Sequence, residues 1–220
     1  MDDAPSPPRL WRGDGTDQAG IAPRARRRTL ARRHVRVRGL GPVGIAAAEA
    51  AARAGAESLS LVGSREAPAS PVARMVARVA PDVRVHLDTT RRVDGEIVAA
   101  YGSVDPALLH RLLLDGPHVV ALVDESGVTV IPVHAGAGPC VRCHTLARTD
   151  RDAAWPVLAR QCEALVERAE PLSATVAGGV AAASLAALLA GGTARPWRIE
   201  RGLPRRTALR PHPACGCDAA

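Results

Sequence analysis

The stretch "HVRVRGLGPVGIAAAEAAARAGAESLSLVG", residues 34–63, decides the fold of this 220-residue chain. Residues 34–38 alternate apolar and polar side chains and predict a β-strand. A glycine-rich turn follows, and the alanine-rich run 45–56 predicts a helix. Residues 58–63 then predict a second strand. Strand, helix and strand in this order form a βαβ unit with parallel strands and a right-handed crossover.

The alternation of helices and strands continues to about residue 125. The further predicted elements are a helix at 71–80, strands at 83–87 and 95–102, a helix at 105–116 and a strand pair at 118–124 and 128–134. A chain that alternates in this way folds as an open sheet with helices on both faces. We therefore expect an α/β, Rossmann-like fold with a mainly parallel sheet.

The second half of the chain is predicted to be mainly helical. Asp and Thr residues at 149–152 can cap a helix that carries Pro156 in its first turn and continues to about residue 169. Small or apolar side chains share one face of this helix: Leu158, Cys162, Leu165 and Ala169. Residues 173–192 predict another helix, and residues 195–202 predict a late strand.

The run 173–192, "SATVAGGVAAASLAALLAGG", is the most apolar stretch of the chain and is close to the length of a membrane span. It consists mainly of Ala and Gly with only three Leu, so its transfer into lipid is weakly favourable and we expect a buried helix. No secretory signal opens the chain, and we expect a cytoplasmic protein without membrane contact.

The formal net charge is +7, and every basic residue is Arg. The arginines are dense in residues 23–38, where no aromatic side chain is interleaved for stacking on bases. This pattern favours a solvated basic surface, or a patch for an acidic protein or peptide, over nucleic acid. We divide the chain into an extended basic arm, residues 1–33, in which "RLWR" at 9–12 could dock as a short strand, and an α/β domain, residues 34–220.

Two cysteine pairs lie far apart in the sequence. "GPCVRCH" places Cys140 and Cys143 three residues apart, and "HPACGC" places Cys215 and Cys217 two apart with Gly216 between them. A C-x-x-C turn positions two thiolates for zinc, and a C-x-C pair can supply the other two corners of a tetrahedron. Four thiolates leave no position for water, so the predicted site is a structural zinc site that ties the C-terminal segment to the domain.

Other interpretations of the cysteines stay open. Disulfides are disfavoured in a reducing cell interior, and a bond within C-x-C would be strained. The thiols could also be free and unrelated. His144 and His212 flank the pairs and could replace one thiolate. Cys162, on the inner face of its predicted helix, is interpreted as a small core residue.

The glycine turn satisfies G-x-G-x-x-G with Gly39, Gly41 and Gly44, directly after a strand and at the start of a helix. In this context the loop predicts a nucleotide site, because the helix N-terminus binds anions. Pro42 removes one backbone N–H, and Arg36 interrupts a strand that is normally apolar on both faces. A packing turn without a nucleotide is the alternative.

The following strand lacks the acidic residue that holds ribose hydroxyls in dinucleotide sites. It ends in Gly63, Ser64 and Arg65, and the Ser-Arg pair could receive a 2′-phosphate, as in NADP enzymes. Separately, Glu66 could be a displaced substitute for the missing acidic residue. No Tyr-Lys or His-Asp set for proton transfer accompanies the loop, because Tyr101 is the single tyrosine and the chain has no lysine.

The glycine loop on a βαβ unit, the C-x-x-C about 100 residues later and the C-terminal cysteine pair together resemble the ThiF/MoeB family. These proteins are adenylyltransferases related to ubiquitin-activating enzymes. Several segments are similar to a divergent bacterial branch associated with peptide modification: "RLWRGDGTDQAGIAP" (9–23), "GPCVRCHTLARTDRDAAWPVLARQ" (138–161), "SATVAGGVAAASLAALL" (173–189) and "HPACGC" (212–217). The resemblance covers about residues 34–217.

The resemblance implies ATP on Gly39, Gly41 and Gly44, and zinc on Cys140, Cys143, Cys215 and Cys217. The family reaction attacks the α-phosphate of ATP with the C-terminal carboxylate of a small protein or peptide. This chain departs from the pattern, since the ribose-binding Asp falls at Gly63, the Asn-Leu-x-Arg-Gln segment has no counterpart and the phosphate-binding Lys is missing. Arg74 or Arg78 could replace the cations, and Asp105 could stand near the magnesium Asp.

These departures favour a ThiF-like scaffold whose adenylation activity is reduced or lost. The hypothesis is a zinc-stabilised partner of a modifying enzyme that binds a precursor peptide or small protein, alone or in a homo-oligomer or heteromer. ATP with magnesium is a doubtful cofactor, and no catalytic residue is assigned. An active adenylyltransferase and an NADP-dependent oxidoreductase are the alternatives.

Overall fold

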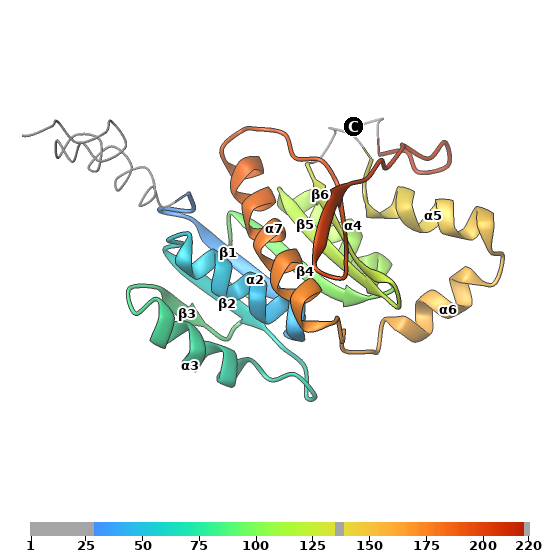
Figure 1. The fold of residues 1–220 in the computed structure, drawn as a ribbon. Helices are drawn as coiled ribbons and strands as arrows, with labels where there is room; N and C mark the ends of the chain where they lie inside the picture. The colour runs from blue at the N-terminus through green and yellow to red at the C-terminus, as the bar shows by residue number, and fades with distance from the viewer. Residues whose placement is uncertain (1–28, 135–138, 218–220) are drawn as a thin grey trace, which may run out of the picture.

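The computed structural model describes residues 29–134 and 139–217, and it contains one eight-stranded mixed sheet with helices packed on both faces (Figure 1). The strands are β1 (His34–Arg38), β2 (Ser58–Val62), β3 (Arg84–His86), β4 (Gly95–Tyr101), β5 (His118–Asp124), β6 (Gly127–Val133), β7 (Trp197–Glu200) and β8 (Leu203–Arg206). The helices are α2 (Pro42–Arg53), α3 (Ala69–Val79), α4 (Pro106–Asp115), α5 (Val141–Arg151), α6 (Trp155–Cys162) and α7 (Pro171–Leu189).

The strand order is β3-β2-β1-β4-β5-β6-β7-β8. The five strands from β3 to β5 are parallel, and β6, β7 and β8 continue the sheet in antiparallel pairings. The expected α/β architecture is confirmed. Because β1, β2 and β4 are parallel, their carboxyl ends meet at one edge of the sheet, where ligand sites of open α/β folds are found.

Two apolar cores lie on opposite faces of the sheet. Side chains of α2, α3 and α7 pack with one face, and side chains of α4 and α5 pack with the other. Helices α2 and α7 lie side by side across the sheet (Figure 1). A Cβ at Gly178 of α7 would stand 2.5 Å from the Ala46 Cβ, so small residues are needed for this close approach. Within the described residues, α7 alone is long and apolar enough to cross a bilayer, and half of that stretch is buried in the protein.

The arginines of β1 are accommodated by an acid on the neighbouring strand. Arg36 is 4% exposed and lies opposite Glu96 of β4, with 3.1 Å between its Nη1 and Oε2. Arg38 Nε donates to the other oxygen of Glu96 at 2.8 Å. A buried charge is tolerated when it is paired and hydrogen-bonded, so this polar face does not prevent a central parallel strand.

The single helix predicted up to residue 169 is wrong. The chain breaks between α5 and α6, and after Cys162 it runs without regular structure to α7. Pro156 does lie in the first turn of α6, as expected. Leu158 and Leu165 are 41% and 55% exposed, so the predicted apolar face is not a core face. Tertiary contacts of the segment 163–170, described below, replace the helix.

The sequence analysis also missed β8. A tight turn at Arg201 and Gly202, with φ of 51° and 74°, joins it to β7 in a hairpin. Two consecutive residues with positive φ are typical of the two-residue turns that connect the strands of a β-hairpin. At the other end, Leu30 is fully buried and its N–H donates to Ala54 O, so residues 29–33 pack on the domain. The rest of the predicted arm, including "RLWR", lies outside the described residues.

Candidate functional site

The glycine loop lies where β1 ends and α2 begins. Gly39 has φ of +77°, and a Cβ there would stand 2.0 Å from Ala99 O on β4. A Cβ at Gly44 would stand 1.7 Å from Gly39 O. Both glycines are therefore required by the contact of strand, turn and helix, whatever the loop binds.

A carboxylate of the same chain occupies the N-terminus of α2. Glu167 Oε1 accepts hydrogen bonds from Val43 N at 2.7 Å and from Gly44 N at 3.3 Å. A Cβ at Gly41 would stand 2.6 Å from this Oε1, so the absence of a side chain at Gly41 leaves room for Glu167. The first N–H groups of a helix have no partner within the helix and form its anion site. Here Glu167 fills that site.

The Glu167 carboxylate is held in a protein interior. The residue is 2% exposed, and burial raises the pKa of its carboxyl group, while N–H donors from Ala169, Val43 and Gly44 act in the opposite direction. Glu170 follows and caps α7 by accepting from Leu172 N and Ser173 N, both at 2.8 Å. The segment between α6 and α7 is thus anchored on both helices α2 and α7.

Beside Glu167 lies a cavity of about 390 Å³ along the carboxyl ends of β1, β2 and β4. Gly63, Ser64, Arg65, Glu66 and Asp105 line it, as do the three loop residues Gly39, Leu40 and Gly41. The structure brings these residues together at one cavity, whereas Gly44, the third glycine of the predicted loop, is not among the residues that line it. Cys162 also lines this cavity and is half-buried, so it is not the simple core residue that we expected.

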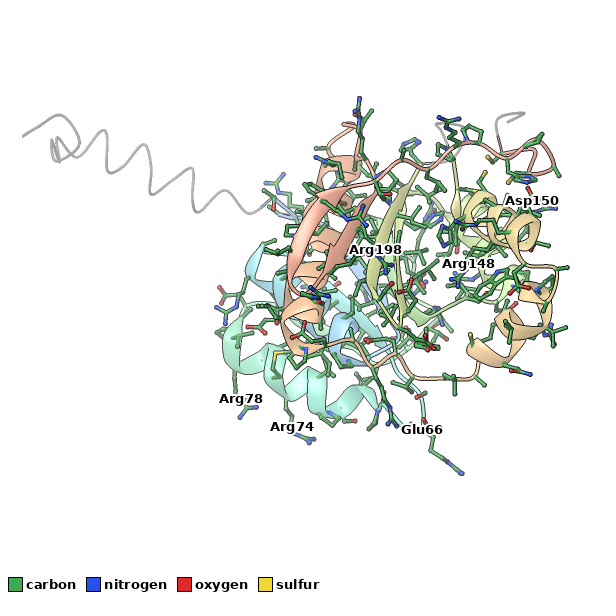
Figure 2. The ribbon with its side chains drawn as sticks, turned by 45° about the vertical axis from the view of Figure 1, so that its right-hand side comes forward. Glu66, Arg74, Arg78, Arg148, Asp150 and Arg198 are labelled. Carbon is green, nitrogen blue, oxygen red and sulfur yellow. The ribbon has the colours of Figure 1, made fainter. Side chains whose placement is uncertain are left out.

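Several of the side chains that the sequence analysis proposed as ligand contacts either lie outside this cavity or already accept hydrogen bonds from neighbouring backbone. Arg74 and Arg78 project from the exposed face of α3 (Figure 2) and are not among the residues that line it, so they do not restore the missing cations. Asp105 accepts from Ala107 N at 2.8 Å and caps α4. Ser64 Oγ accepts from Ala67 N at 3.1 Å. Both side chains thus have local structural partners.

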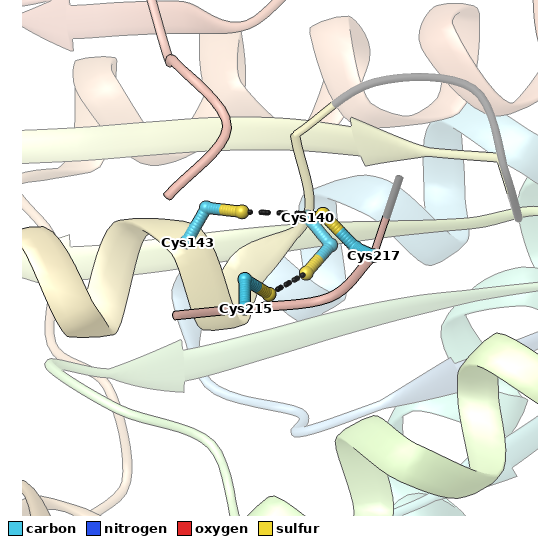
Figure 3. Close-up of side chains that lie close together, drawn as sticks. All are labelled: Cys140, Cys143, Cys215 and Cys217. Atoms are coloured by element: carbon cyan, nitrogen blue, oxygen red, sulfur yellow. Dashed lines mark hydrogen bonds between the residues drawn. The ribbon is translucent and has the colours of Figure 1, made fainter. Parts of the chain in front are cut away.

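The four cysteines meet around one point (Figure 3). Their Sγ atoms all lie within 4.8 Å of one another, with 3.5 Å between Cys140 and Cys215 and 3.3 Å between Cys143 and Cys217. A zinc–sulfur bond of about 2.3 Å in a tetrahedron places sulfurs roughly 3.8 Å apart, so the four thiols fit zinc. All four are free thiols here, and their separations exceed the roughly 2 Å of a disulfide.

The local structure also suits thiolates. Cys140 occupies the N-cap position of α5 without a side-chain capping hydrogen bond, and Cys143 lies in the first turn, where the helix N-terminus favours negative charge. His212 N donates to Cys143 Sγ at 3.4 Å. Burial and the neighbouring thiols raise the pKa of Cys215 to about 11. A bound zinc ion reverses this effect, because its charge deprotonates the thiols that coordinate it.

Neither flanking histidine takes the place of a thiolate. His212 Nε2 lies 2.8 Å from Asp150 Oδ2, and its Nδ1 accepts from Ala214 N at 3.1 Å. His144 lines the neighbouring groove between α5 and the sheet. Burial, then the charges of Arg148 and Arg151, lower its pKa to about 4. The four cysteines form the only group of three or more metal-ligating side chains found among the described residues.

No protein-family model matches the chain, and no curated protein matches it by sequence. Solved structures do match. The chain is similar to Escherichia coli MccB bound to MccA-N7isoAsn, with a TM-score of 0.63 and 12% identity over 96% of this chain and 76% of MccB. The microcin C7 biosynthetic enzyme MccB with N-formylated MccA gives 0.64, with 12% identity over 90% and 71%. PaaA gives 0.57, with 12% identity over 94% and 86%.

These matches extend over most of the chain, and they show that it has the fold of MccB, a ThiF/E1-like adenylyltransferase. The expected resemblance is confirmed at the level of the fold. At 12% identity the comparison shows the fold alone, so the chemistry has to be argued from the residues of this chain.

Proposed function

We propose that this protein is a ThiF-like scaffold with a degenerate nucleotide site, stabilised by zinc and acting as a peptide- or protein-binding partner of a modifying enzyme. The position of Glu167 carries the proposal. A phosphate on the glycine loop would need the N–H groups of Val43 and Gly44, which Glu167 already engages. A phosphate beside this carboxylate would also meet like charge at short range.

The charges around the cavity support the same conclusion. Two cationic side chains line it, Arg38 and Arg65, and Arg38 is already paired with Glu96. Four carboxyl groups face them: Glu66, Asp105, Glu163 and Glu167. Adenylation depends on fixed positive charge that neutralises the phosphates in the transition state. This cavity has an excess of negative charge, which disfavours a triphosphate.

The peptide part of the proposal draws on the structural relatives. MccB has been solved in complex with the precursor peptide MccA, so a protein with this fold binds a peptide. We extend that property to the present chain as a scaffold that holds a precursor peptide or small protein, in the cytoplasm, as a homo-oligomer or with a modifying enzyme.

Calorimetric titration with ATP and magnesium tests the nucleotide part. We expect no binding by the wild type, and no exchange of labelled pyrophosphate into ATP in the presence of an acceptor peptide. Glu167→Ala removes the competing carboxylate, and we expect it to gain measurable ATP affinity, whereas Glu66→Gln, which removes another carboxylate that lines the same cavity, should not. Pyrophosphate exchange by the wild type would establish the active adenylyltransferase instead.

The oxidoreductase alternative has a separate readout. Ser64 and Arg65 do line the cavity, so an NADP-type ligand can be tested directly. We expect no change in NADPH fluorescence on titration with the protein. An increase that Arg65→Ala abolishes would favour the oxidoreductase.

A further inference from the structure

A second concave surface lies between α5 and the strands β6 and β7. It consists of two cavities of about 430 and 470 Å³ that share Thr129, His144 and Arg151. Because both cavities include these residues, they form one elongated groove, which we call the α5 groove. One end lies at Trp155 and the other at the C-terminal segment near His212.

The α5 groove is lined by four arginines: Arg148, Arg151, Arg198 and Arg210. Two carboxyl groups line it as well. Asp124 is bound by Arg198 through two hydrogen bonds of 2.8 and 2.7 Å, and this pairing outweighs burial and lowers the pKa of Asp124 to about 2. Asp152 accepts from Ala154 N at 2.9 Å. The groove therefore has an excess of positive charge.

Arg198 is paired with carboxylates of the protein, whereas the other three arginines have no carboxylate partner in the described residues. Arg198 is 9% exposed and also donates to Thr129 Oγ1 and Glu200 Oε1. Arg148 stacks on Trp155, with its guanidinium 3.5 Å from the ring centroid, and Arg151 donates to Ala147 O. In the described residues, Arg148, Arg151 and Arg210 form no ion pair with a carboxylate.

At the Trp155 end of the groove, two polar side chains are partly or fully removed from water. Trp155 is 6% exposed and its Nε1 is buried without a hydrogen-bond partner in the described residues. Burial also lowers the pKa of Arg148, which shows that its charge is partly removed from water. A cation in this position is stabilised by an anion that replaces the lost water.

We propose that the α5 groove binds an extended peptide segment rich in aspartate and glutamate, whose carboxylates pair with Arg148, Arg151 and Arg210. The elongated shape accepts a chain, and the unpaired guanidinium groups match carboxylates in charge and in hydrogen-bond geometry. This inference rests on the proposed function, because it gives the peptide-binding partner a binding surface. That surface is separate from the cavity at the glycine loop.

A fluorescein-labelled oligoglutamate, followed by fluorescence anisotropy at about 0.1 M salt, where the Debye length is about 10 Å, tests this site, with oligoglutamine as the neutral probe. Arg148→Ala/Arg151→Ala should weaken oligoglutamate binding by about tenfold or more, because two charge-assisted contacts are lost. The matched control is Arg74→Ala/Arg78→Ala on the exposed face of α3, which removes the same net charge far from the groove (Figure 2). It should bind within about threefold of wild type, since screening by salt shortens the range of its effect.

The outcomes separate the groove from general attraction to a basic protein. Equal weakening by both double variants, or wild-type affinity in Arg148→Ala/Arg151→Ala, would overturn the proposal. Arg148→Lys/Arg151→Lys keeps the charge and should retain most of the affinity. If the alanine double variant does not fold by circular dichroism, Arg210→Glu, at an exposed position, replaces it and should also weaken binding. ATP titration of the same samples tests the proposed function independently, so either can fail alone.

Discussion

The glycine loop and the cysteine cluster are both places where a ThiF-like chain is expected to hold a ligand, and they differ in how their polar groups are satisfied. At the loop, Glu167 of the same chain already accepts from the helix N-terminus. At the cluster, the Sγ atoms of four cysteines lie within 4.8 Å of one another, an arrangement that fits a single metal ion. The comparison teaches that a glycine loop can keep its backbone geometry while a carboxylate of the same chain occupies the N-terminus of its helix.

The largest expected effect tests the cysteine side of this comparison. Cys143→Ser should abolish zinc binding and lower the free energy of unfolding by several kcal/mol, because zinc binding contributes directly to folding. Metal analysis and thermal unfolding, with and without a chelator, measure this. Cys162→Ser is the matched control and should retain one zinc per chain. Normal folding of metal-free wild-type protein would contradict the prediction.

The next effect concerns the packing role of the loop. Gly44→Ala places a Cβ 1.7 Å from Gly39 O, where the backbone cannot yield, so we expect a loss of about 3 kcal/mol in unfolding free energy. Gly179→Ala in α7 is the control. It has open space around its Cβ and should be stabilised by roughly 0.5–1 kcal/mol, as expected for Gly to Ala within a helix. Urea denaturation of the two variants gives both values.

Glu167 itself should have an intermediate effect. Glu167→Ala leaves the Val43 and Gly44 N–H groups without their acceptor, which is expected to cost about 1–3 kcal/mol. Glu167→Gln keeps an acceptor oxygen and should cost less. Equal losses in the two variants would show that the hydrogen bonds to the loop contribute little.

The pH dependence of Glu167 has a definite sign. Burial raises the folded-state pKa of its carboxyl group above the unfolded value, so its contribution to stability is present below the unfolded pKa and is lost as the pH rises through the folded pKa. The stability of Glu167→Gln relative to wild type should therefore increase from about pH 4 upward. Urea denaturation of both proteins over pH 4–8 measures this difference, and a constant difference would contradict the prediction.

The smallest expected effect concerns the contact between Asp150 and His212, beside the cysteine cluster. Asp150 is exposed and pairs with His212 at 2.8 Å, next to the segment that carries Cys215 and Cys217. Asp150→Asn should lower stability by less than about 1 kcal/mol, because the contact is exposed and water competes for its polar groups. Zinc affinity, measured by competition with a chelator, should fall slightly. Without Asp150, His212 is less well fixed, and its backbone N–H donates to Cys143 Sγ. Loss of zinc would show that the pair has a larger role.

Local patterns in the sequence predicted most of the elements because strand alternation, glycine turns and helix composition act over short distances. The βαβ unit at 34–63 and the spacing of Cys140 from Cys143 are of this kind. The prediction of one helix up to residue 169 failed because the segment 163–170 is held by contacts with α2 and α7 instead of by its own propensity. The hairpin of β8 was missed although Arg201-Gly202 is a recognisable turn signal.

The sequence by itself determined the class of fold and the four thiols that can bind one zinc ion, because both follow from residue type and spacing. Only the tertiary structure decided what lies on the glycine loop. Glu167 is 123 residues from Gly44 in the chain, and no local pattern relates the two. A carboxylate meets a helix N-terminus at that distance only when the whole sheet, α2 and α7 have been assembled around them.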